Sequence, residues 1–190
     1  MIRVISGLLK GRRIEFNNKK FDSADISPQM LKEAFFSIID NKNKGGFLDL
    51  FAGSGQIGIE ALSRGFLRVD FVELNYRRFQ FIKQTVDSFG LSGRASFNHM
   101  SVYDFLKNNA GRNVFYDIIY ADPPYEKISG NADSYRILLE EIKMAGIVSD
   151  DTLIVLQHFG KNDIEYDNDF FMCHDKRNYG TSSISFFGKK

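Results

Sequence analysis

The most constraining feature of the sequence is a glycine-rich segment between a predicted strand and a predicted helix. Residues 47–51 form a mostly apolar run, Gly53, Gly55 and Gly58 follow in a G-x-G-x-x-G pattern, and residues 59–64 have helical character. Glu73 lies twenty residues beyond Gly53, at the tip of the next predicted strand. Glycines let the backbone approach a ligand closely, and an acidic residue at that tip can accept hydrogen bonds from ribose hydroxyls. The spacing predicts a ribose-bearing cofactor, and because no Lys-Ser or Lys-Thr pair follows the glycines, it does not indicate a phosphate-binding P-loop.

Strands and helices alternate along most of the chain. The predicted strands are 47–51, 69–73, 95–99, 116–121, 152–158, 170–173 and 183–187, and the predicted helices are 31–39, 59–64, 76–89 and 134–145, the first of them preceded by Ser27 as N-cap and Pro28. Such alternation favours a largely parallel sheet with helices on both faces. The end of the chain, which is poor in helices, predicts a final antiparallel hairpin. Residues 3–16 are predicted to form two short strands with turns at Gly7 and Gly11.

The composition is that of a globular protein. A length of 190 residues favours one domain, and 43% hydrophobic with 26% charged residues is ordinary for a soluble chain. No segment approaches the roughly 20 apolar residues of a membrane span or resembles a signal peptide, so we expect a soluble, cytoplasmic protein. The single cysteine, Cys173, excludes an internal disulfide, and no spacing of histidine and cysteine residues indicates a metal site.

Positive charge is concentrated at the N-terminus. The first twenty residues carry a net charge of +5, whereas the whole chain carries only +1. The basic residues Arg3, Lys10, Arg12 and Arg13 belong to the predicted hairpin. A basic arm on a near-neutral body is a modest indication of nucleic-acid binding, and a solvated hairpin explains it equally well. We expect residues 1–22 to form this extension and residues 23–190 to form the main domain.

A second motif, Asp122-Pro123-Pro124-Tyr125, follows the short buried strand 116–121. Ligands of open α/β sheets bind at the carboxyl ends of the strands. There, the Asp122 carboxylate and a backbone carbonyl can accept the two hydrogens of a planar amine and orient its nitrogen for attack. The prolines stiffen that carbonyl, and the Tyr125 ring can stack on a base taken out of its helix. The motif therefore predicts methylation of a nucleobase amine.

Together these motifs resemble the class I amino-methyltransferases that use S-adenosylmethionine, and more closely the RsmD-type 16S ribosomal RNA guanine-N(2)-methyltransferases. The resemblance extends over nearly the whole chain and includes the N-terminal hairpin, the segment 50–65 and Tyr179-Gly180-Thr181. It implies an α/β fold with a Rossmann-like, seven-stranded sheet, six strands parallel and one antiparallel, after a small basic hairpin. The implied reaction is methyl transfer to the exocyclic amine of a guanine in small-subunit ribosomal RNA.

The resemblance also assigns residues to roles. Asp122, Pro123, Pro124 and Tyr125 would carry the catalytic chemistry; the cofactor would contact Asp49, Phe51, Ala52, Gly53, Ser54, Gly55, Glu73, Leu74, Ser101 and Val102; and Arg3, Lys10, Arg12 and Arg13 would contact RNA. The expected partner is ribosomal RNA or a small-subunit particle, and the protein is expected to be a monomer. Residues 25–33 differ from the Arg-Pro-Thr and Asp-Arg-Val-Arg-Glu segments usual in the family, and Ser101 stands where an acidic residue is common.

Three other functions remain open from the sequence: two enzyme classes, and an RNA-binding protein that uses no cofactor. An adenine-amine methyltransferase acting on DNA or RNA would use the same Asp-Pro-Pro-Tyr motif, although the DNA enzymes usually carry a further recognition region. A nicotinamide-dependent oxidoreductase would fit the glycine-rich segment alone, but the second motif argues against it.

Overall fold

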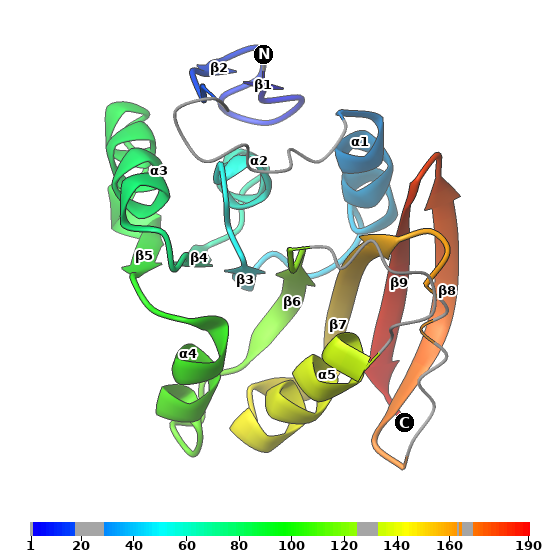
Figure 1. The fold of residues 1–190 in the computed structure, drawn as a ribbon. Helices are drawn as coiled ribbons and strands as arrows, with labels where there is room; N and C mark the ends of the chain where they lie inside the picture. Colours follow the sequence, from blue (N-terminus) through cyan, green and yellow to red (C-terminus); the bar gives the residue numbers. More distant parts are fainter. Residues whose placement is uncertain (1, 18–28, 125–132, 163, 165–168) are drawn as a thin grey trace.

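The computed structural model describes residues 2–17, 29–124, 133–162, 164 and 169–190, and it contains a seven-stranded sheet with helices on both faces (Figure 1). The sheet consists of β3 (Gly46–Leu50), β4 (Arg68–Val72), β5 (Ala95–Asn98), β6 (Tyr116–Ala121), β7 (Val148–Phe159), β8 (Phe171–Tyr179) and β9 (Ser182–Lys189). Their spatial order is β5-β4-β3-β6-β7-β9-β8, and β9 is antiparallel to both of its neighbours. This confirms the predicted sheet of six strands in one direction and one in the other.

The helices divide between the two faces of this sheet. They are α1 (Gln29–Ile38), α2 (Gln56–Ser63), α3 (Tyr76–Ser88), α4 (Val102–Asn109) and α5 (Asp133–Ala145). In Figure 1, α1, α2 and α3 cover one face, and α4 and α5 cover the other. Because side chains alternate along a strand, Phe47 of β3 joins the apolar cluster under α1–α3, whereas Leu48 and Leu50 join the cluster under α4 and α5.

The order of the strands reverses between β3 and β6. From β3 the chain continues outward through β4 to β5, then returns to place β6 on the other side of β3. All five parallel strands, β3 to β7, therefore present their carboxyl ends at one edge, with the reversal at its centre. Open α/β sheets bind their ligands at such a reversal.

Several predicted bounds were wrong. α2 begins at Gln56, so Gly58 lies inside the helix rather than in the preceding turn, and β7, β8 and β9 are longer than predicted. α4 was not predicted at all, although Ser101 caps it by accepting a hydrogen bond from the Asp104 amide at 3.0 Å. A Ser-x-x-Asp pattern before an apolar repeat is a helix-start signal that the sequence did contain. Ser27 and Pro28 lie outside the described residues.

The predicted N-terminal hairpin is present as β1 (Ile2–Arg3) paired antiparallel with β2 (Arg13–Ile14). Gly7 and Gly11 have φ angles of +81° and +84°, in the left-handed region that favours glycine. A Cβ atom at Gly7 would also lie 1.9 Å from the Ser63 carbonyl oxygen at the end of α2. The hairpin therefore packs directly onto α2, while the domain boundary at residue 22 stays a prediction. Within the described part of the chain, no helix is long and apolar enough to cross a membrane.

Candidate functional site

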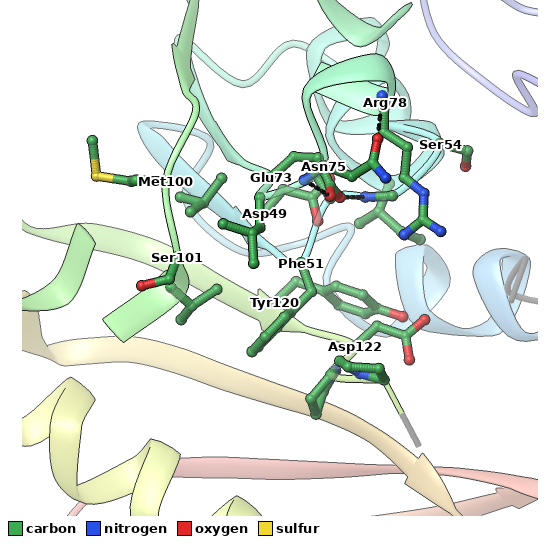
Figure 2. A pocket seen from close by; sticks show the side chains of 18 of the residues that line it. Asp49, Phe51, Ser54, Glu73, Asn75, Arg78, Met100, Ser101, Tyr120 and Asp122 are labelled. Carbon is green, nitrogen blue, oxygen red and sulfur yellow. Dashed lines mark hydrogen bonds between the residues drawn. The ribbon is translucent and has the colours of Figure 1, made fainter. Parts of the chain in front are cut away.

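A cavity of about 640 Å³ opens at the carboxyl ends of β3, β4 and β6, where the strand order reverses. Most of the residues that the sequence assigned to a site line it (Figure 2): Asp49, Phe51, Ala52, Gly53, Ser54, Glu73, Leu74, Ser101, Val102, Asp122, Pro123 and Pro124. Gly55 is not among the lining residues, and Tyr125 lies outside the described residues. The fold thus brings together two motifs that are about seventy residues apart in the sequence.

The loop between β3 and α2 is shaped by left-handed backbone conformations. Phe51, Gly53 and Gly55 have φ angles of 61°, 56° and 72°. For a bulky residue such as Phe51 this conformation is strained, and such strain is often found at ligand sites. Gly58, one turn into α2, has a different role: a Cβ atom there would lie 2.2 Å from the Phe71 ring of β4, so only glycine allows this close packing of helix on sheet.

Asp49 connects β3 to the start of α2. Its Oδ2 atom accepts a hydrogen bond of 2.9 Å from the Gly58 amide, one of the first amides of a helix, which lack partners within the helix itself. Burial raises the pKa of the Asp49 carboxyl well above its usual range, the Gly58 hydrogen bond opposes that shift, and the nearby charges of Asp122 and Glu73 add to it. The floor of the cavity therefore concentrates carboxylate groups and favours a positively charged ligand.

Glu73 connects the glycine-rich loop to the end of β4. One carboxylate oxygen accepts a hydrogen bond from the Gly53 amide and the other from the Asn75 amide, both at 2.7 Å. Asn75 in turn caps α3 by accepting hydrogen bonds from the amides of Arg77 and Arg78 at 3.0 and 3.2 Å. Since a carboxylate can accept about four hydrogen bonds, the held Glu73 side chain retains acceptor capacity for a ligand.

The Asp122-Pro123-Pro124 segment leaves the end of β6 on the opposite side of the cavity. Tyr120, which precedes it by two residues, donates a hydrogen bond of 2.5 Å from its hydroxyl to the Gln157 side chain of β7. Its ring packs against Phe35 of α1 with a centroid distance of 4.9 Å. These contacts fix the strand end from which Asp122 extends. Figure 2 shows Tyr120 and Asp122 on the same side of the cavity.

The wall predicted to border an adenine ring is formed by the start of α4. Ser101 and Val102 line the cavity there, together with Met100 and Tyr103. The Ser101 hydroxyl lies 2.6 Å from the Asp104 carboxylate, to which it donates a hydrogen bond. The Ser101 side chain therefore stabilises the helix start, which leaves mainly the apolar Val102 and neighbouring backbone to face a base.

The predicted RNA-binding residues lie elsewhere. Arg3, Lys10, Arg12 and Arg13 are exposed on the hairpin, and none of them lines the cavity. Arg12 has its guanidinium 5.7 Å from the centre of the Phe89 ring, just after α3. In Figure 1 the hairpin lies beside α2, on the face of the sheet that α1–α3 cover, and its basic residues are absent from the cavity lining.

The structure adds residues that the sequence interpretation missed. Asn75 and Tyr120 position Glu73 and the Asp122 strand, and Arg78 contributes a basic side chain to the cavity wall. Asn75 could have been recognised as an N-cap before an amphipathic run. No sequence pattern indicates that Arg78 rather than Arg77 faces the cavity. The absence of a metal and the monomeric state stay predictions.

The fold and the motifs have counterparts in known proteins. "Putative rRNA methyltransferase YlbH" of Bacillus subtilis is 32% identical over 193 residues, which covers all of both chains. "Ribosomal RNA small subunit methyltransferase D" of Buchnera aphidicola is 33% identical over 127 residues, 66% of this chain and 64% of that protein.

Solved structures show the same fold. "Putative methyltransferase yhhF from Escherichia coli" superposes with a TM-score of 0.81 at 23% identity, over 100% of this chain and 98% of that one. The structure of "SMU.776, a putative methyltransferase complexed with SAH" superposes with a TM-score of 0.67 at 17% identity, over 84% of this chain and 49% of that one. The model of the family "Conserved hypothetical protein 95" matches residues 2–188. The chain therefore belongs to this family, the RsmD-like family that its motifs indicated.

Proposed function

We propose that this protein transfers the methyl group of S-adenosylmethionine to the exocyclic N2 amine of a guanine in small-subunit ribosomal RNA. One observation carries the proposal: the Glu73-anchored glycine loop and the Asp122-Pro123-Pro124 segment line the same cavity. The first feature suits a ribose-bearing cofactor and the second suits a planar amine. The names of the relatives support ribosomal RNA as the substrate class.

S-adenosylmethionine is the cofactor, and the residues present fit it. The cofactor carries positive charge on its sulfur and its amino group, and Asp49, Glu73 and Asp122 line the cavity with carboxylates. Burial of Asp49 next to two other acidic groups makes its charged form costly until a cation is near. The fixed Glu73 carboxylate is placed to accept hydrogen bonds from ribose hydroxyls, and the loop 51–55 lets the backbone come close.

In the reaction, the protein mainly positions the amine. When bound, the cofactor supplies an electrophilic methyl group. Asp122 and the Pro123 carbonyl accept the two amine hydrogens, which directs the nitrogen lone pair toward the methyl carbon. As the N–C bond forms, the methyl–sulfur bond would break and its electron pair would stay on sulfur, which leaves as a neutral thioether; the nitrogen becomes electron-poor, and Asp122 would stabilise the positive charge that develops there. The nitrogen would then release one proton, and Asp122 is the proposed acceptor. No covalent link to the protein is required.

The basic hairpin supplies contacts to the RNA backbone. Arg3, Lys10, Arg12 and Arg13 are exposed, and positively charged side chains bind phosphates without reading sequence. The hairpin is fastened to α2, whose first residues line the cavity, so a helix of eight residues connects the two sites. RNA bound to the hairpin would therefore have a defined position relative to the cavity.

The test is mass-spectrometric mapping of ribosomal RNA from a strain that lacks the gene. We expect one guanine of the small-subunit RNA to lose an N2-methyl group, and a plasmid with the wild-type gene to restore it. A plasmid encoding Asp122→Asn is the matched control and should not restore it. Loss of a methyl group from an adenine, or from no ribosomal nucleotide, would refute the proposal.

A further inference from the structure

The cavity walls have an uneven distribution of charge. Asp49, Glu73 and Asp122 provide carboxylates, whereas Arg78 is the basic residue among the described residues that line the cavity. Its side chain is half-buried, on the first turn of α3. An arginine in this position offers a rigid fork of N–H donors, which matches the geometry of a carboxylate or phosphate.

Arg78 belongs to the wall that also carries Glu73. The Glu73 carboxylate accepts a hydrogen bond from the Asn75 amide, and the Asn75 side chain accepts one from the Arg78 amide. Hydrogen bonds therefore link the three residues. In Figure 2 the Arg78 side chain extends from this wall into the part of the cavity toward Tyr120 and Asp122, on the side of Ser54. The Ser54 hydroxyl belongs to a residue only 6% exposed that also lines the cavity.

We propose that Arg78 is the residue that binds the carboxylate at the amino-acid end of the cofactor, with Ser54 as a neighbouring donor. This inference rests on the proposed function. An amino acid carries both charges, and the carboxylates of the cavity suit its ammonium group but would repel its carboxylate. The Arg78 guanidinium supplies a positive charge that can bind this carboxylate. A phosphate of the RNA is the other anion to consider, but the Arg78 side chain lies on the side of Ser54, which belongs to the glycine-rich loop that the cofactor is expected to contact.

Two ligands separate these interpretations without any turnover. S-adenosylhomocysteine carries the amino-acid end, and 5′-methylthioadenosine has the same adenosine and thioether but lacks it. We would titrate the full chain with each ligand by calorimetry, using wild type, Arg78→Met, Arg78→Lys and, as a matched control, Arg77→Met. Arg77 lies one residue away, is exposed and does not line the cavity.

We expect Arg78→Met to weaken S-adenosylhomocysteine binding by about tenfold or more, as for loss of a hydrogen bond between charged groups, and 5′-methylthioadenosine binding by less than about twofold. Arg78→Lys should recover part of the loss, and Arg77→Met should bind both ligands as wild type does. An equal loss for both ligands would overturn the inference, because Arg78 would then act on the adenosine end. Unchanged S-adenosylhomocysteine binding would overturn the inference, and weaker binding of ribosomal RNA by Arg78→Met in a parallel titration would then favour a phosphate. If wild type bound neither ligand, the proposed function itself would fail.

Discussion

Replacing Glu60 with glutamine should destabilise the protein strongly, although Glu60 lies outside the cavity. Its carboxylate is completely buried and receives backbone amides from the hairpin, Ile5 at 2.8 Å on Oε2 and Ser6 at 2.9 Å on Oε1. Arg64 donates to Oε1 at 2.9 Å, and the Lys32 ammonium, itself 1% exposed, lies 3.5 Å from Oε2. The fold therefore encloses one negative charge between two positive charges where the hairpin contacts α2.

The cost follows from these contacts. The glutamine side chain has one acceptor end, so either the Ile5 or the Ser6 amide would face an NH₂ group and lose its partner. A buried donor without an acceptor costs about 1–3 kcal/mol. Lys32 would keep its buried charge without a counter-charge, and breaking a buried ion pair on one side costs about 3–5 kcal/mol. Because the two costs overlap, we expect a loss of about 3–5 kcal/mol in the free energy of unfolding, a large part of the 5–15 kcal/mol typical of a domain.

Urea denaturation of wild type, Glu60→Gln and Glu15→Gln would measure this loss. Glu15 is an exposed residue that follows β2, so the same chemical change there should cost less than about 0.5 kcal/mol. Hydrogen exchange would locate the effect, since the amides of Ile5 and Ser6 should exchange faster in the Glu60 variant. A loss below about 1 kcal/mol would refute the reasoning and show that the hairpin is held by its apolar contacts alone.

The pH dependence of the free energy of unfolding gives a second test of the same contacts between the hairpin and α2. Burial lowers the pKa of Lys32 below 10.5, while Glu60 raises it and so opposes the shift. Removing the Glu60 charge lowers this pKa further. Since folded Lys32 then loses its proton at a lower pH than unfolded Lys32 does, stability rises as the pH increases toward 10.5. The difference in the free energy of unfolding between wild type and Glu60→Gln should therefore become smaller between pH 7 and about pH 9.5. If this difference stayed constant, the buried Lys32 charge would not be its cause.

Three further predictions concern the cavity and the hairpin. Glu73→Ala should weaken S-adenosylmethionine binding by about 1.5–3 kcal/mol in calorimetry, and it should also lower stability because the Gly53 and Asn75 amides lose their acceptor; unchanged affinity would remove Glu73 from the cofactor site. Asp122→Asn should lower single-turnover methyl transfer to a small-subunit particle by at least about a hundredfold with little change in cofactor affinity, and near-normal transfer would disprove the amine-orienting role. Replacing Arg12 and Arg13 with alanine should weaken RNA binding and flatten its dependence on salt, whereas an unchanged salt slope would make the hairpin a solvated surface only.

The parts of the fold that the sequence predicted well are those in which local and tertiary preferences agree. The strand 116–121 and the bounds of α3 were predicted almost to the residue, because a short apolar run that ends at prolines indicates a buried strand and an apolar face at helical spacing indicates an amphipathic helix. The grouping of the candidate site residues around one cavity was predictable for a different reason. The carboxyl ends of parallel strands meet at one edge, so Glu73 and Asp122 had to lie near each other once both were assigned to strand ends.

Other features depend on contacts that no local pattern encodes. The length of β8 is set by its pairing with β9, although exposed polar residues such as Lys176 and Arg177 do not favour a strand by themselves. Glu60 and Lys32 lie on helices and look like surface residues in the sequence, yet both are buried because the hairpin packs over them. Burial of this kind follows only from the tertiary arrangement.

The position of α2 explains why a buried cluster of charged residues holds the hairpin in place. The first residues of α2, Gln56 and Ile57, line the cavity, and Gly58 donates to Asp49 on its floor. Two turns at most separate these contacts from Glu60 and Ser63, which hold the hairpin through its backbone amides. A short helix that is fixed at both ends cannot tilt without breaking buried hydrogen bonds. Glu60→Gln should therefore impair methyl transfer to a large RNA particle more than it impairs binding of the cofactor.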